Sequence, residues 1–260
     1  MYIKLYDELT IQDNFIFQKV MRNKRICKQT IERLLDIDIK DISYPEEEKS
    51  INVRLDSKSI RLDVYVNDDK GTVFNIEMQT TKDMDELVKR TRYYQGLIDI
   101  DNIEKGQNYS ALHDTYIIFI CTFGVFTGKR HKYTFRNLCI EDNEILLNDG
   151  TTKLFLSTKG EADDVSKPLK MFLDYVDGKK PEDALMQEID HEVDTVKHCD
   201  EWRRDYMTLA LEMDKKWREG KAEGKIEAIR NAIKDGLTTL AAVKKSGRYT
   251  EEEIAAIAAP

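Results

Sequence analysis

The residues whose chemistry stands out first are acids inside two strand-like segments, "IRLDVYV" (60–66) and "TVFNIEMQ" (72–79). In both segments apolar side chains occupy the even positions, and polar side chains occupy several of the odd positions. Because side chains alternate between the two faces of a strand, burying the apolar residues on one face puts Asp63, Glu77 and Gln79 together on the other. Carboxylates inside a sheet cost free energy unless a cation, a hydrogen-bond donor or water meets them.

Two carboxylates and one amide on adjacent strands form a group that could share a hard cation. Mg²⁺ takes oxygen ligands at about 2.0–2.1 Å and needs only one or two protein carboxylates beside a substrate phosphate oxygen. The hairpin therefore predicts either a magnesium site or a polar, solvent-facing sheet edge with no ligand. The pattern of these two strands is equally consistent with the magnesium site and with the ligand-free sheet edge.

The elements around this hairpin follow from hydrophobic periodicity. One helix is expected from Asp13 to about Leu35, ending before "SYPEEEKS", and another from Met84 to about Ile100 with Leu87, Val88, Tyr94, Leu97 and Ile98 inside. This order of elements predicts an α/β protein with a mixed sheet flanked by helices. The expected strands are "SINVRL", "IRLDVYV" and "TVFNIEMQ" as an antiparallel meander, then "DTYIIFICTFG" as a buried strand, "HKYTFRNL" and "TKLFLS".

After Gly160 the pattern becomes helical, which predicts a domain at 1–160 and a helical region at 161–260. We expect the helical region to support self-association, as a homo-oligomer, or DNA engagement, and to supply no catalytic group. Trp202 and Trp217 in this region are better explained by packing or dimer contacts than by base stacking.

Composition and charge limit the classes of function that this chain can have. The chain has 260 residues, 41% hydrophobic and 35% charged, with a net charge of −8. It contains no apolar run near the roughly 20 residues of a membrane helix and no apolar leader, so we expect a cytoplasmic protein without a membrane partner. The four cysteines and four histidines lack the spacing of a disulfide framework or a zinc site. The acidic balance disfavours a nucleic-acid coat, although Lys19–Arg33 and Lys215–Arg248 are basic; solvated helix faces explain these clusters equally well.

The motifs resemble the PD-(D/E)XK nuclease superfamily and, within it, the transposase-like branch called recombination-promoting nucleases. The resemblance covers roughly residues 8–130 and rests on "DNFIFQKVM", the strand "NIEMQ" and "KRTRYYQGLI" in the following helix. It implies a restriction-endonuclease-like mixed sheet flanked by helices, with a helical C-terminal appendage.

The resemblance also implies roles for the acids. Asp63 and Glu77 would bind Mg²⁺, for which Mn²⁺ can substitute, together with backbone near Ile76. Gln79 stands where the superfamily has lysine and would position the attacking water. Because an amide carries no charge, the metal would supply more of the positive charge that stabilises the phosphate.

Four further residues are candidates for accessory roles. Arg90, Arg92 and Tyr93 in the helix after the third strand could contact a phosphate, and a surface salt bridge is the alternative for the arginines. Asp13 is expected to be an N-cap or a further acid at the edge of the site.

The function implied is a metal-dependent endonuclease that hydrolyses DNA phosphodiester bonds, in recombination or transposition-like processes of a bacterial cell. Two alternatives remain open at this point: a non-catalytic nucleic-acid-binding or interaction module with the same fold, and a nuclease directed at RNA.

Overall fold

The computed structural model describes residues 3–44, 46–51 and 60–259. It contains two compact units, one formed by Asp7–Cys199 and the other by Met1–Tyr6 with Asp200–Pro260. The helices directly after residue 160 therefore belong to the same compact unit as the sheet. The division of roles expected near residue 160 stays a prediction.

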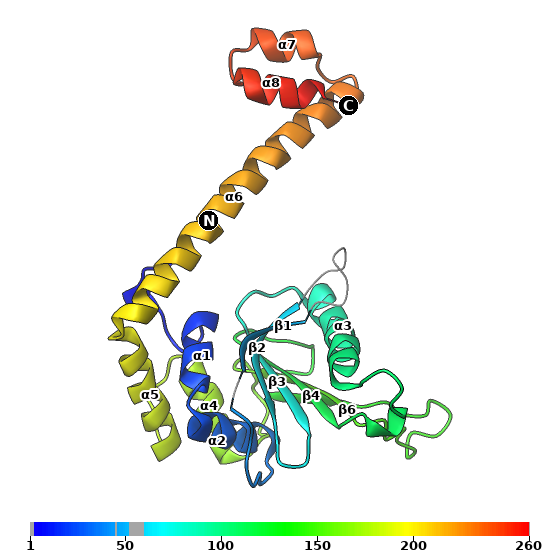
Figure 1. Cartoon of the computed structure of the whole chain (residues 1–260), viewed down its shortest axis with the longest axis vertical. Helices are drawn as coiled ribbons and strands as arrows, with labels where there is room; N and C mark the ends of the chain where they lie inside the picture. The colour runs from blue at the N-terminus through cyan, green and yellow to red at the C-terminus, as the bar shows by residue number, and fades with distance from the viewer. Residues whose placement is uncertain (1–2, 45, 52–59, 260) are drawn as a thin grey trace. The chain divides into compact units, whose positions relative to one another are not determined.

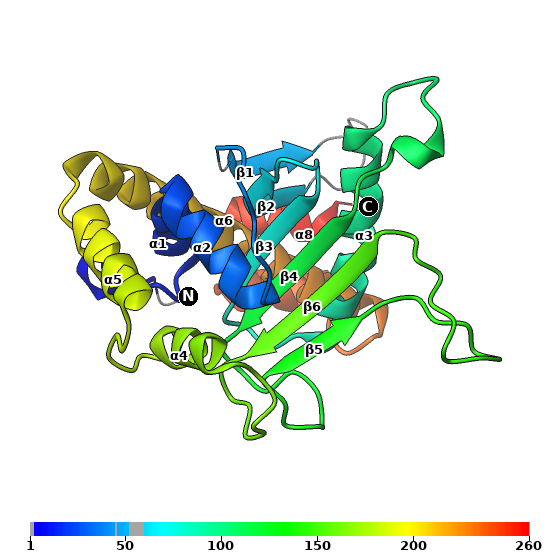
Figure 2. The same ribbon diagram turned by 90° about the horizontal axis from the view of Figure 1, so that it is seen from below.

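A six-stranded mixed sheet forms the centre of the larger unit, with strand order β1-β2-β3-β4-β6-β5 (Figure 2). The first three strands make the predicted antiparallel meander, β4 and β6 run parallel to β3, and β5 is antiparallel at the edge. The predicted α/β mixed sheet is confirmed. The strands are β1 (Glu46–Ile51), β2 (Ile60–Asn67), β3 (Val73–Gln79), β4 (Thr115–Cys121), β5 (Lys132–Phe135) and β6 (Thr151–Ser157).

The first strand begins earlier than the sequence indicated. The expected segment was "SINVRL", but β1 already pairs with β2 at Glu46. Only Ser50 and Ile51 of the expected strand lie in β1, and its remainder, 52–55, lies outside the described residues.

Helices cover both faces of the sheet, with α1 and α2 on one side and α3 on the other (Figure 1). On the α3 side, Leu87, Tyr94 and Ile98 pack with the strand residues Phe119 and Phe155. Val88, which was expected inside, is 46% exposed. The described helices of this unit are α1 (Asn14–Met21), α2 (Lys24–Leu35), α3 (Met84–Asn102), α4 (Lys167–Val176) and α5 (Ala184–Lys197), with a short 3-10 turn at Tyr109–Ala111. Another 3-10 turn, Tyr6–Glu8, begins in the last residue of the segment Met1–Tyr6.

The single helix expected from Asp13 to Leu35 was wrong, because the structure has two. The chain breaks at Asn23, whose side-chain oxygen accepts hydrogen bonds from the backbone nitrogens of Arg25 and Ile26. Asparagine is a strong N-cap because it satisfies amides that a new helix leaves free. The continuous apolar periodicity concealed this break.

The smaller unit consists of α6 (Asp200–Lys234), α7 (Leu240–Lys245) and α8 (Glu251–Ala258). The Tyr206 hydroxyl donates to the carbonyl oxygen of Lys4 at 2.8 Å near the start of α6. Near its other end, Lys225 pairs with Glu253 of α8 at 2.9 Å. Within the described ranges, no helix combines the length and the apolar character needed to cross a membrane.

Candidate active site

Where β2 and β3 separate, the side chains of two acids take the place of the backbone hydrogen bonds that would otherwise join the strands. The last residues in register are Val64 and Ile76. One residue further along β2, the backbone nitrogen of Asp63 donates to Oε1 of Glu77 at 3.1 Å, and Oδ2 of Asp63 accepts from the backbone nitrogen of Met78 at 3.1 Å. Each carboxylate thus reaches across to the neighbouring strand, so the structure brings these two acids together.

Helix α1 holds the other oxygen of Asp63. Oδ1 accepts from Nε2 of Gln18 at 2.9 Å and from Nδ2 of Asn14 at 3.4 Å. Sequence reasoning missed both residues, although their spacing of four places them on one helix face. Asp13 stands at the N-cap position of α1, but its side chain makes no cap hydrogen bond and accepts instead from the backbone nitrogen of Thr10 at 2.8 Å.

Arg90 of α3 connects the second acid with the amide. Its Nη2 lies 3.2 Å from Oε2 of Glu77, and its Nη1 donates to Oε1 of Gln79 at 3.0 Å. The same guanidinium donates to the Tyr94 hydroxyl at 2.9 Å and lies over the rings of Tyr94 and Phe119. These contacts on several sides fix the position of the cation beside the carboxylates.

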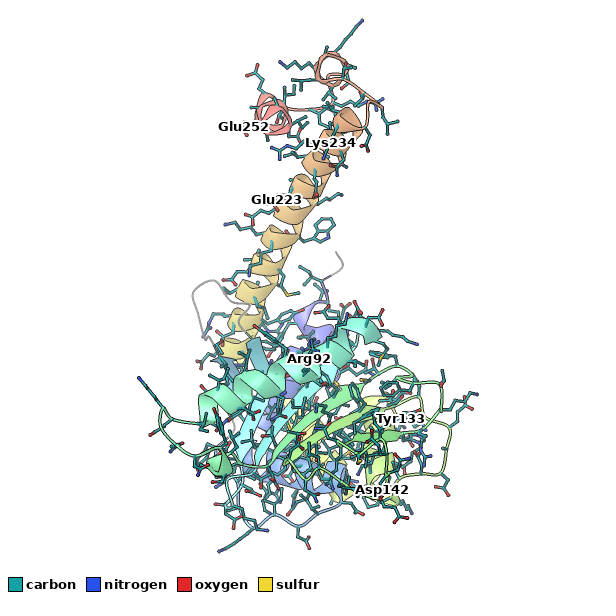
Figure 3. All side chains as sticks on the ribbon, turned by 90° about the vertical axis from the view of Figure 1, so that its right-hand side faces the viewer. Arg92, Tyr133, Asp142, Glu223, Lys234 and Glu252 are labelled. Carbon is teal, nitrogen blue, oxygen red and sulfur yellow. The ribbon has the colours of Figure 1, made fainter. Side chains whose placement is uncertain are left out.

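The other two candidates on α3 take different positions. Arg92, labelled in Figure 3, is exposed, and Tyr93 is 39% exposed. At about 100° per residue, Arg92 lies roughly 200° around the helix from Arg90 and therefore on its other side. The structure brings Arg90 to the acids and places Arg92 on the other side of the helix, while Tyr93, three residues after Arg90, lies partly exposed on the Arg90 side.

Gln79 has its amide oriented by two contacts. Its oxygen accepts from Arg90, and its nitrogen donates to the backbone oxygen of Thr81 at 2.9 Å. The amide nitrogen carries two hydrogens, so one remains for a further acceptor.

The site has more negative than positive charge in a buried setting. Asp63 is 6% exposed and Glu77 is 2% exposed. Burial, followed by the charge of Asp63, raises the pKa of Glu77 well above its usual value, while the backbone amide of Asp63 and the charge of Arg90 act in the opposite direction. Burial raises the pKa of Tyr94 to about 12, so its hydroxyl stays protonated beside Arg90.

The donor set fits a hard divalent cation. Two buried carboxylates share one neighbouring arginine, and the buried side-chain amide of Asn75, on the same face as Glu77, is a hydrogen-bonding neighbour that works against the rise in the pKa of Glu77. The described part of the chain has no group of three or more His, Cys, Asp or Glu side chains placed to hold a metal. Carboxylate and amide oxygens are ligands of the kind that hard divalent cations bind.

A buried thiol lies on the neighbouring strand but does not suit chemistry at this site. Cys121 pairs in register with Gln79. Burial raises the pKa of the Cys121 thiol to about 12. Since the thiolate is the nucleophilic form, this side chain is inert near neutral pH.

The basic cluster predicted at Lys19–Arg33 is largely neutralised by neighbouring acids. An arginine or lysine whose charge is already paired has less to offer a phosphate backbone. The pairs in this cluster are Lys24 with Asp41, Arg25 with Glu188, Lys28 with Glu32, and Arg33 with Asp183.

A mixed sheet between helices, with an acid of the second strand meeting a glutamate of the third, defines a restriction-endonuclease-like α/β protein. The family model of the PD-(D/E)XK nuclease family transposases matches residues 14–158, more than half of the sequence, and the chain belongs to this family. The match runs from α1 through β6 and contains both acids, Gln79 and Arg90. No curated protein and no solved structure gives a match to this chain.

Proposed function

We propose that this protein is a metal-dependent endonuclease that hydrolyses DNA phosphodiester bonds, in recombination or transposition-like processes. The observation that carries the proposal is the placement of two buried carboxylates, Asp63 and Glu77, each of which accepts a hydrogen bond from the backbone of the neighbouring strand where β2 and β3 separate. The family match supports a nuclease, and the excess negative charge at this point supports a cation as its cofactor.

Asp63 and Glu77 would hold the divalent cation, Mg²⁺ with Mn²⁺ as a substitute. When bound, such an ion lowers the pKa of a coordinated water and offsets charge on the phosphate. The side chain of Gln18 and the backbone amide of Met78 fix the Asp63 carboxylate in place. A ligand held from two sides loses little conformational freedom when it binds, which favours affinity.

Arg90 supplies the fixed positive charge that a lysine at position 79 would have supplied. Gln79 accepts a hydrogen bond from this guanidinium, so its first role here is to hold Arg90 beside the site. A guanidinium can donate two parallel hydrogen bonds to a phosphate. The remaining amide hydrogen of Gln79 can direct an attacking water, as the family resemblance implies.

The test is incubation of the purified protein with supercoiled plasmid DNA and with structured RNA, each in Mg²⁺, Ca²⁺ or EDTA. We expect plasmid nicking in Mg²⁺ and none in EDTA, and loss of nicking in Glu77→Gln. Glu104→Gln makes the same chemical change at an exposed residue just after α3 and should leave nicking unchanged.

Two other outcomes of this experiment would change the proposed function. RNA cleavage without DNA cleavage would assign the same site to RNA. DNA binding without cleavage of either substrate in any metal would contradict the enzyme and favour a binding module.

A further inference from the structure

A polar cavity of about 140 Å³ lies beside the strands β4 and β6. Its lining includes Tyr116 of β4 and Thr152 of β6, which are in register with each other. Tyr116 is also in register with Phe74 and stacks on its ring, and Phe74 lies three residues before Glu77 on β3. Because side chains alternate along a strand, Tyr116 and Glu77 lie on opposite faces of the sheet. The cavity is therefore separate from the proposed active site.

Two opposite charges line this cavity, and each keeps capacity for a ligand. Nε of Arg136 donates to the Thr152 hydroxyl at 3.3 Å, and the other nitrogens of the guanidinium have no partner within the described part of the chain. The Asp114 carboxylate also lines the cavity and has neither an ion pair nor a side-chain hydrogen bond among the described residues. The cavity thus offers a strong acceptor and a strong donor.

A glycine holds the two charges at a separation that a small ligand can bridge. Gly150 has a φ of +86° less ten, that is +76°, and a Cβ atom added there would lie 2.6 Å from Oδ1 of Asp114. The carboxylate therefore lies beside residue 150, while the guanidinium contacts residue 152. Residues two apart on a strand are separated by roughly 6.6 Å. This spacing is too long for a direct ion pair and leaves room for a ligand between the two groups.

The size and the chemistry of the cavity together define the ligand. A cavity of about 150 Å³ holds one benzene ring, so this volume suits a single six-membered ring. The ring must present a hydrogen-bond donor to Asp114 and acceptors to Arg136. Cytosine does so along one edge, where its N4 amino group donates and its N3 and O2 atoms accept, and acidic side chains accept from cytosine N4 in protein complexes with DNA. Uracil carries an oxygen in place of the amino group and would face the carboxylate with an acceptor.

We propose that this cavity binds an unpaired cytosine base, whose N4 amino group donates to Asp114 and whose N3 and O2 atoms accept from Arg136. The base must be unpaired because base pairing uses the same edge. The ring of Tyr116 and the side chain of Leu146 also line the cavity and supply apolar contacts for the faces of the base. A free nucleoside and a cytosine within a single strand both present this edge. The proposal does not depend on the nuclease activity.

The first experiment titrates the full chain with cytidine and with uridine by calorimetry, in EDTA. We expect cytidine to bind about tenfold or more tightly than uridine, and Arg136→Met to weaken cytidine binding by about the same factor. Arg92→Met, on the exposed side of α3, should leave cytidine binding unchanged. Absence of cytidine binding up to about 10 mM would overturn the proposal. Equal affinity for the two nucleosides would also overturn it, as would tighter binding of free alanine, which would assign the two charges to an amino acid.

The second experiment tests the orientation of the base through its specificity. Asp114→Asn keeps the shape of the side chain but adds a donor that can meet the O4 atom of uracil. The preference for cytidine over uridine should therefore fall several-fold in this variant. Asp69→Asn makes the same change at an exposed residue of the β2–β3 turn and should preserve the preference. An unchanged preference in Asp114→Asn would overturn the assignment of this carboxylate to the N4 amino group.

The third experiment distinguishes the two sources of the base. Single-stranded oligo(dC) and oligo(dT) are compared by fluorescence anisotropy in EDTA. A preference for oligo(dC) that Arg136→Met removes would assign the cavity to cytosines within a strand, whereas cytidine binding without such a preference would assign it to the free nucleoside. Glu77→Gln should bind cytidine like the wild type, because Glu77 lies on the other face of the sheet. Failure of the nuclease proposal would therefore leave these binding results unchanged, and loss of cytidine binding in Glu77→Gln would contradict a separate site.

Discussion

The backbone amide of Asp63 donates a hydrogen bond to the Glu77 carboxylate at 3.1 Å, at the position where the next rung of the β2–β3 ladder would stand. The carboxylate of Asp63 in turn accepts a hydrogen bond from the backbone amide of Met78. The same two side chains thus join the strands and form the proposed metal site. Substitutions that remove them affect folding and chemistry together, and variants must be chosen to separate the two effects.

Glu77→Gln is the variant that separates them. Its amide oxygen can still accept from the Asp63 backbone, but it offers no negative charge to a cation. We expect DNA cleavage to fall by about a hundredfold or more. Mg²⁺ should raise the melting temperature of the wild type, by an amount corresponding to about 2.7 kcal/mol at a hundred times its Kd, and should leave that of Glu77→Gln unmoved. Thermal melts with Mg²⁺ and with EDTA measure this, and equal shifts in both proteins would remove Glu77 from the metal site.

Arg90 should matter through its shape as well as its charge. Arg90→Met removes the cation between Glu77 and Gln79 and should lower kcat by about a hundredfold. Arg90→Lys keeps the charge but loses the planar fork, so its kcat should lie between the two. Arg92→Met is the matched control on the exposed side of α3 and should change kcat little. Steady-state nicking rates measure these differences in kcat. An equal loss of kcat in both methionine variants would show that the position of Arg90 is not special.

The end of the catalytic unit can be tested with fragments. Helices α4 and α5 contribute buried side chains, among them Leu169, Phe172 and Ile189, each worth roughly 1.5–3 kcal/mol of burial. A fragment of residues 7–199 should melt cooperatively and keep the nuclease activity of the full chain, whereas a fragment of residues 7–165 should not melt cooperatively. Calorimetry distinguishes them, and cooperative melting of the shorter fragment would support a boundary near residue 160.

Alkaline stability reports how α4 and α5 are joined. The Tyr175 hydroxyl of α4 donates to Asp190 of α5 at 3.0 Å, and burial together with this carboxylate raises the pKa of Tyr175. Between the ordinary tyrosine pKa of about 10 and the raised pKa of Tyr175, the folded state holds a proton that the unfolded state has lost. The free energy of unfolding should therefore fall as the pH rises above about 10, and Tyr175→Phe should lack this part of the fall. Urea titrations across that range, compared between the two proteins, measure the difference.

The sequence predicted the meeting of the two acids because strand alternation is a strict rule. Once Val64 and Ile76 had to be buried, Asp63 and Glu77 had to share the other face. The antiparallel meander of the first three strands and the class of fold followed from element order in the same way. These parts depend on local periodicity, which a single sequence displays.

The contacts between elements were harder to predict because they depend on how a helix is rotated against the sheet. "KRTRYYQ" offered Arg90 and Arg92 equally, and only the packing of α3 decides that Arg90 faces inward. Likewise Asp13 was expected to be an N-cap or a further acid at the edge of the site, whereas the neutral Asn14 and Gln18 contact Asp63. The break at Asn23 was missed because a side-chain cap interrupted the helix without interrupting its apolar pattern.

The hydrogen bonds that the Glu77 and Asp63 carboxylates accept from the backbone amides of Asp63 and Met78 also have an evolutionary consequence. A gene copy that replaces either acid with a small side chain leaves a strand amide unpaired in the core, at a cost of about 1–3 kcal/mol. Such a copy should be less stable as well as inactive. Inactive descendants that persist should instead carry asparagine or glutamine at these two positions, which keep an oxygen for the neighbouring strand.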